Sequence, residues 1–264
     1  MKNLKSIIII GWFFCLSLGA HATSPQKKDL LLASCVRPVA AYEMQVNNVR
    51  AKLFSGGHLF NKDQSSGNYF TPASASPSVS AIYSGGVWMG GVDRAGSIKL
   101  SATAYQSNGF DFFAGPLDLL GTTEATNCSQ WDKIFTVKGS NILQHIQNYK
   151  EALENQTFLS CNNISDDILY WPAQGNPFFE EKYGWKLPDQ PLANYFDQNN
   201  DGHYNPCLGD YPILDIASCS EEKYKIPTEI NFFIFNDAGG PQTLSGPKSM
   251  QMEFQVNAFA YNTT

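Results

Sequence analysis

The sequence predicts a mainly β protein of the β-rich α+β class, with antiparallel sheets, long ordered loops and one main amphipathic helix near residues 140–155. Aromatic residues, which favour strands, make up 13% of the 264 residues, and the turn-forming residues Gly (21) and Pro (14) are plentiful. Several short segments alternate apolar and polar side chains, whereas one segment repeats with a helical period. Hydrophobic residues reach 43% and charged residues 16%, so the chain can bury a sizeable core.

The N-terminus has the features of a secretory signal peptide. Two lysines in Met1–Lys5 precede the apolar stretch Ile7–Leu18, and Ala20-His21-Ala22 has the small-x-small pattern of a cleavage site. The alternative is a membrane anchor, but this stretch is too short to span a bilayer comfortably, and no other apolar run is long enough. We therefore expect residues 1–22 to be removed on export, which leaves a secreted or extracellular protein without a transmembrane segment.

The rest of the chain is predicted to form a leader with the first strand, residues 23–46, and one β-rich extracellular domain, residues 47–264. Val49–Phe54 alternates before Gly56-Gly57 and is predicted to be a strand. Further on, Asp93–Gly96 has the composition of a tight turn. The segments on either side of that turn are predicted to pair as a hairpin: Ser80–Met89 and Ser97–Tyr105.

The helical pattern covers residues 140–155. Its apolar side chains fall on one face at helical spacing: Ile142, Leu143, Ile146, Tyr149 and Leu153. His145 lies in the same segment, away from any second candidate ligand, so we interpret it as a packing or surface histidine.

Two strands are predicted near the C-terminus, Ile230–Phe235 and Met250–Ala260, and the second alternates cleanly between apolar and polar residues. A long amphipathic strand at a chain end needs a neighbour, because otherwise it exposes an unpaired edge. We therefore expect the β-rich domain to be incomplete at its C-terminus.

The cysteines are interpreted as disulfide partners, because an exported chain meets an oxidising environment. Cys15 leaves with the signal peptide. Cys207 and Cys219 flank a short loop rich in Asp and Pro and are predicted to pair. Cys128 and Cys161 bracket the predicted helix and form the second predicted pair, which leaves Cys35 unpaired or bound to a partner outside this chain. Spacing alone leaves other pairings open.

The segment Asp197–Asp210 is a candidate calcium loop. Its opening places oxygen-bearing side chains at positions one, three and five and a glycine at position six, which is the spacing of a calcium-binding loop. The residues that would contribute oxygen ligands are Asp197, Asn199, Asp201, the carbonyl of His203, Asn205 and Asp210. Leu208 stands where an EF-hand has its bidentate Glu, and no helical pattern flanks the loop, so an EF-hand sensor is not expected. The alternative is an Asn/Asp-Gly turn that hydrogen-bonds to itself.

The classes of function follow from charge and from motifs. The net charge of −6 argues against nucleic-acid binding. There is no Gly-x-Ser-x-Gly, His-Glu-x-x-His or phosphate-loop motif, so no catalytic or cofactor-binding residues are predicted apart from the Ca²⁺ ligands. We expect a non-catalytic structural or adhesion module, with an unknown surface component or a glycan as its partner. A carbohydrate-binding module is the alternative, and a secreted hydrolase is a weaker one. The candidate stacking residues for a sugar are Trp88, Trp131, Trp171 and Trp185.

Several segments together resemble a known group of proteins: Asn47–Ala51, Gly86–Asp93, Asn108–Leu117, Trp171–Asn176, Gly209–Pro212 and Phe232–Asp237. They are similar to the N-terminal region of large exported surface proteins of Bacteroidota, of the kind that carries a C-terminal sorting domain for type IX secretion. The resemblance implies a secreted or cell-surface protein of a Gram-negative bacterium without an assigned activity. It also implies that such a chain continues into further β-rich regions.

Overall fold

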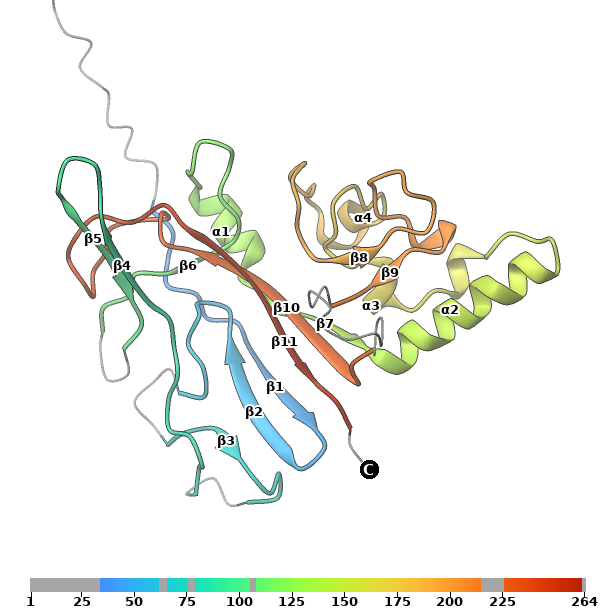
Figure 1. Ribbon diagram of the computed structural model, residues 1–264, viewed down its shortest axis with the longest axis horizontal. Helices are drawn as coiled ribbons and strands as arrows, with labels where there is room; N and C mark the ends of the chain where they lie inside the picture. Colours follow the sequence, from blue (N-terminus) through green and yellow to red (C-terminus); the bar gives the residue numbers. More distant parts are fainter. Residues whose placement is uncertain (1–33, 62–65, 76–78, 105–107, 215–225, 263–264) are drawn as a thin grey trace, which may run out of the picture. The chain divides into compact units, whose positions relative to one another are not determined.

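The computed structural model describes residues 34–61, 66–75, 79–104, 108–214 and 226–262 (Figure 1). The predicted signal peptide, residues 23–33 of the predicted leader and Cys219 lie outside these residues. All the described residues belong to one compact unit, Leu32–Thr264. Within the described ranges, no helix has the length and apolar character that crossing a membrane requires.

The predicted fold class is confirmed, since every pair of named strands in the described residues is antiparallel. The first sheet has the order β1 (Ala41–Val46), β2 (Val49–Phe54), β3 (Tyr69–Phe70). A tight turn joins β1 to β2. In it Asn47 has a φ of 56° and its side-chain oxygen accepts the N–H of Val49 at 2.9 Å. Asn tolerates this left-handed conformation better than most residues, which explains why it occurs here.

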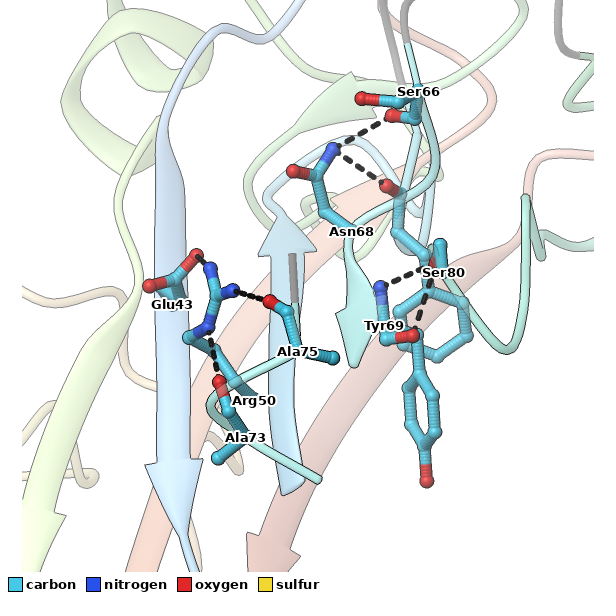
Figure 2. A network of polar contacts seen from close by, with 9 residues as sticks. Glu43, Arg50, Ser66, Asn68, Tyr69, Ala73, Ala75 and Ser80 are labelled. Carbon is cyan, nitrogen blue, oxygen red and sulfur yellow. Dashed lines mark hydrogen bonds and ion pairs between the residues drawn. The ribbon is translucent and has the colours of Figure 1, made fainter. Parts of the chain in front are cut away.

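Arg50 of β2 fixes the chain that follows β3 (Figure 2). Its guanidinium donates to the carbonyls of Ala73 and Ala75 and pairs with the carboxylate of Glu43 on β1 at 3.4 Å. Figure 2 also shows the Ser80 hydroxyl between the backbone N–H and C=O of Tyr69, both at 3.0 Å. The segment that begins at Ser80 is therefore held against β3.

The predicted hairpin is confirmed as β4 (Trp88–Val92) paired with β5 (Ile98–Ala102). In the turn, the Asp93 side chain accepts the N–H groups of Ala95 and Ser97, both at 2.9 Å. The first strand is shorter than predicted, because most of the chain between Ser80 and Val87 has no strand partner.

A four-stranded sheet contains the long strand β10 (Glu229–Asn236), which lies between the other strands of the sheet. On one side β10 pairs with β11 (Glu253–Ala260), and on the other with β6 (Phe113–Ala114) and β7 (Phe135–Lys138). All the residues of β10 are buried. Alternate side chains enter different clusters, because successive residues of a strand point to opposite faces: Ile230, Phe232 and Ile234 in one, Phe233 and Phe235 in the other. The sequence of a strand that is buried on both faces is expected to be a run of mostly apolar residues.

The remaining elements pack around the larger of these clusters, and all of them except α2 are short. They are α1 (Ala125–Trp131), α2 (Gly139–Glu154), α3 (Asp166–Leu169), α4 (Phe179–Tyr183), the 3-10 turns η1 (Cys161–Asn163) and η2 (Pro206–Leu208), and the strands β8 (Tyr195–Phe196) and β9 (Tyr211–Pro212).

Helix α2 confirms the predicted helix, but the predicted buried face is partly wrong. Ile142 is buried as expected, whereas Leu143 and Leu153 are 58% and 57% exposed. His145 is buried and lies one turn from Ile142, so the packed stripe follows these two residues rather than the full set of apolar side chains.

Both predicted disulfide pairs are wrong. The structure joins Cys35 to Cys128 and Cys161 to Cys207, with Cα–Cα distances of 5.8 and 5.2 Å. Cys128 bonds to Cys35, and Cys161, on the other side of α2 in the chain, bonds to Cys207 instead. Cys207 is already used by Cys161, which excludes the predicted bridge to Cys219. Cys35 is not left over, because its segment lies beside β6 and α1 in a small buried cluster.

Candidate functional site

The Asp197–Asp210 loop lies between two short paired strands, β8 and β9. Tyr195 is opposite Pro212 and Phe196 is opposite Tyr211, and the rings of the latter pair stack with centroids 4.9 Å apart. Both ends of the loop are therefore held side by side at its base.

The first half of the loop folds around the side chain of Asp197. One carboxylate oxygen accepts the N–H of Gly202 at 2.8 Å, and the other accepts that of Asp201 at 3.3 Å. The Asn199 side-chain oxygen also accepts the Asp201 N–H, and its amide group donates to the Asp201 carboxylate at 2.8 Å. Gly202 has a φ of 79°, a conformation that side chains rarely adopt. The structure thus brings together Asp197, Asn199 and Asp201, as the sequence predicts.

Hydrogen bonds within the loop favour the ionised form of Asp201. The N–H of His203 donates to its carboxylate at 2.8 Å, and this hydrogen bond, followed by that from Asn199, lowers the pKa of Asp201. Asn199, Asp201 and His203 are exposed, so a cation has access to this part of the loop.

Two other predicted ligands have different surroundings. Asp210 is 0% exposed, and its two carboxylate oxygens accept the N–H groups of Gln198 and Asn205 at 2.9 and 2.7 Å. Burial raises the pKa of Asp210, and the charges of Asp197 and Asp201 raise it further. The Asn205 side chain accepts the N–H of Cys207 and caps η2. Asp210 and Asn205 therefore stabilise the loop through hydrogen bonds to its backbone N–H groups.

Tyr195, next to the loop, has a raised pKa. Burial raises the pKa of Tyr195 to about 12, with further contributions from the charges of Asp197, Asp210 and Asp201.

No three His, Cys, Asp or Glu side chains in the described part of the chain form a group that could hold a metal ion. A calcium ion bound here would therefore need amide and carbonyl oxygens in addition to carboxylates.

The base of the loop is fixed by contacts with distant segments. The N–H of Tyr204 donates to the carbonyl of Gln174 at 2.8 Å, and the buried Tyr204 hydroxyl donates to the carbonyl of Ile168 at 2.7 Å. His145 of α2 contacts the carbonyl of Asp210 through Nε2 at 3.0 Å, and burial lowers its pKa. The segments Trp171–Asn176 and Gly209–Pro212, which the sequence singles out separately, thus belong to one packed region.

The four candidate stacking tryptophans divide into two groups. Trp131, Trp171 and Trp185 are buried in the large core cluster, where they pack against aromatic rings such as Phe179 and Phe232. Trp88 is 80% exposed. Of the four, Trp88 alone presents a ring to solvent.

Trp88 borders an open cavity of about 820 Å³. No sequence pattern predicts the other side chains that line it, which are His58, Tyr83, Ser84, Thr103 and Ala104. A local signal is the Gly85-Gly86 pair two residues before Trp88, because paired glycines near an aromatic residue allow close approach of the backbone.

Asp166 and Asp167, two acidic residues adjacent in the sequence, both take part in contacts within the fold. Asp166 pairs with Lys182 at 2.8 Å, and Asp167 accepts the backbone N–H of Lys138 and the side-chain amide of Asn141.

No protein-family model, curated protein or solved structure matches this chain.

Proposed function

We propose that this protein is a non-catalytic secreted or cell-surface module, structural or adhesive, in which Ca²⁺ stabilises the Asp197–Asp210 loop. The observation that supports the proposal most is the fold of the loop around Asp197, with Asn199 and Asp201 on the same exposed turn. Asp197, Asn199, Asp201 and the carbonyl of His203 would bind the ion. Hard cations such as Ca²⁺ prefer carboxylate, amide and carbonyl oxygens, and water completes their coordination.

The expected role of the ion is to offset repulsion. Asp197 and Asp201 lie in one turn, where the Asp197 carboxylate accepts the N–H of Asp201, and the charges of both raise the pKa of Asp210. A divalent cation at the exposed turn reduces this repulsion, and the loop becomes more stable. Without the bidentate Glu of an EF-hand, we expect a Kd of roughly 10⁻⁴ M, which suits the calcium concentration outside cells.

An extracellular location is supported by the two disulfides, because such bonds persist in oxidising compartments. We also propose that the protein belongs to the exported surface proteins of Bacteroidota that use type IX secretion. The support is the set of segments that resemble that group, among which Trp171–Asn176 contacts the loop that ends in Gly209–Pro212, through the Gln174 carbonyl and the Tyr204 N–H.

Thermal unfolding with and without Ca²⁺ tests the calcium proposal. At a free Ca²⁺ concentration about tenfold above a Kd of roughly 10⁻⁴ M, binding adds about 1.4 kcal/mol to the free energy of unfolding. For a domain of this size, that is a Tm increase of about 3–6 °C.

The matched variants are Asp201→Ala and Asp93→Ala, because Asn would keep an oxygen that can bind Ca²⁺. Both replace an aspartate whose carboxylate accepts a backbone N–H in an exposed turn, but Asp93 lies in the β4–β5 hairpin. Asp201→Ala should lose the calcium-dependent increase, and Asp93→Ala should keep it. An unchanged Tm in millimolar Ca²⁺, or the same increase in Asp201→Ala, would show that the loop is an ordinary hydrogen-bonded turn.

A further inference from the structure

Trp88 is an exposed aromatic side chain whose position is fixed. It is the first residue of β4, and its indole N–H donates to the carbonyl of Thr103. The polar edge of the ring is thus satisfied within the protein, and the ring cannot rotate freely without breaking this bond. What remains open to solvent is the apolar face. The exposed ring borders the same cavity as a second exposed aromatic side chain, Tyr83, and the two together mark a candidate binding surface.

The cavity beside this ring has the size of a small-molecule site. Its volume of about 820 Å³ lies within the usual range for such sites. A second aromatic side chain, Tyr83, lines it and is also exposed. Polar groups come from His58, Ser84 and Thr103. Aromatic faces and a few polar groups therefore surround one open space.

The walls of the cavity are held by backbone contacts. Gly85 and Leu59 exchange hydrogen bonds at 2.9 and 3.0 Å, and the N–H of Thr103 donates to the carbonyl of Val87 at 2.9 Å. A Cβ atom on Gly86 would lie 1.7 Å from the Thr103 hydroxyl oxygen, so only glycine permits this approach of the backbone. The segment that leads to Tyr83 is in turn held to β3 through Ser80 (Figure 2). A site built in this way is formed before its ligand arrives, which reduces the entropic penalty of binding.

The chemistry of the lining selects a class of ligand. No Asp, Glu, Lys or Arg is among the described residues that line the cavity, which favours a neutral ligand over an ionic one. A pyranose sugar has an apolar C–H face that packs on an aromatic ring, and hydroxyl groups at its rim that bond to hydroxyl, imidazole and backbone groups. We propose that the cavity beside Trp88 binds a neutral oligosaccharide, with the pyranose ring stacked on the indole.

This inference goes beyond the proposed function and does not rest on it. The described residues that line the cavity all lie between His58 and Ala104 in the sequence, and none of them belongs to the Asp197–Asp210 loop. Failure of calcium binding and failure of sugar binding are therefore separate results.

The test is acrylamide quenching of tryptophan fluorescence in the full chain, in the presence of EGTA. The other tryptophans of the described chain are buried, so the difference between wild type and Trp88→Ala isolates the emission of Trp88. The probes are neutral oligosaccharides of glucose, galactose, mannose, xylose and N-acetylglucosamine, and oligogalacturonate serves as the charged counterpart.

We expect at least one neutral oligosaccharide to protect Trp88 from quenching, with saturation. In calorimetry, Trp88→Ala should then weaken its binding about tenfold or more, and Trp88→Phe, which keeps an aromatic face, should weaken it less. The matched control is Val92→Ala. Val92 is exposed on the same hairpin, pairs with Ile98 at the far end, and does not line the cavity, so this change should leave binding unaltered.

Three results would overturn the inference. The first is no protection by any neutral probe, and the second is binding of oligogalacturonate alone. The third is self-association of the chain that Trp88→Ala and Val92→Ala abolish equally, because the hairpin would then be a protein interface.

Discussion

Removing the Cys161–Cys207 bridge should strongly destabilise the protein. The two cysteines are separated by 46 residues. In the chain-entropy model, a closed loop of that length contributes about 4 kcal/mol, whereas the short loop between Cys207 and Cys219 would contribute about 3 kcal/mol. Domains are stable by only about 5–15 kcal/mol, so the double variant Cys161→Ser/Cys207→Ser should lose a large part of its stability. Its Tm should fall by about 8–16 °C.

The assay is unfolding in guanidinium chloride, followed by the fluorescence of the buried tryptophans. The control is Cys219→Ser, which leaves the bridge between Cys161 and Cys207 intact and should change the free energy of unfolding by less than about 0.5 kcal/mol. If Cys219→Ser destabilised the protein as much as the double variant does, the pairing would be wrong. A loss below about 1 kcal/mol in the double variant would contradict the magnitude.

Two further predictions concern the base of the loop. Gly175 and Gly184 both have positive φ values, but a Cβ on Gly175 would lie 2.6 Å from the ring of His203, whereas nothing lies within 4 Å of one on Gly184. In chemical denaturation, Gly184→Ala should lose about 1 kcal/mol and Gly175→Ala clearly more; equal losses would refute the contact with His203. Burial lowers the pKa of His145, so the folded state binds fewer protons than the unfolded state. The contribution of His145 to the free energy of unfolding should be fully present above its unfolded-state pKa, near 6.5, and should be lost as the pH falls through its folded-state pKa. The Tm should therefore decrease less between pH 7.5 and 5 in His145→Gln than in the wild type. An equal decrease in both proteins would contradict this.

The elements that the sequence predicts correctly have local patterns. The apolar run of β10 reflects burial on both faces, and the hairpin turn at Asp93 is specified by its own side chain, which accepts two nearby N–H groups. The opening of the candidate calcium loop is also local, since Asp197 bonds to residues only four and five positions away, whereas its binding of Ca²⁺ stays a prediction. Such features are visible in a short window of sequence.

The features that were missed depend on long-range packing. Cys35 and Cys128 are 93 residues apart and meet because both pack beside Phe113 of β6. Similarly, Trp131 and Trp88 look equivalent in the sequence. The first is buried by residues from several distant elements, and the second lies in a hairpin whose outer face stays open. No spacing rule distinguishes these two environments.

Calcium binding to the Asp197–Asp210 loop is the central claim, and isothermal titration calorimetry with Ca²⁺ tests it most directly. The account predicts one ion per chain with a Kd of roughly 10⁻⁴ M, and no measurable binding in the double variant Asp197→Ala/Asp201→Ala. Absence of binding heat in the folded wild-type protein at several temperatures and millimolar Ca²⁺, or unaltered binding in the double variant, would contradict it.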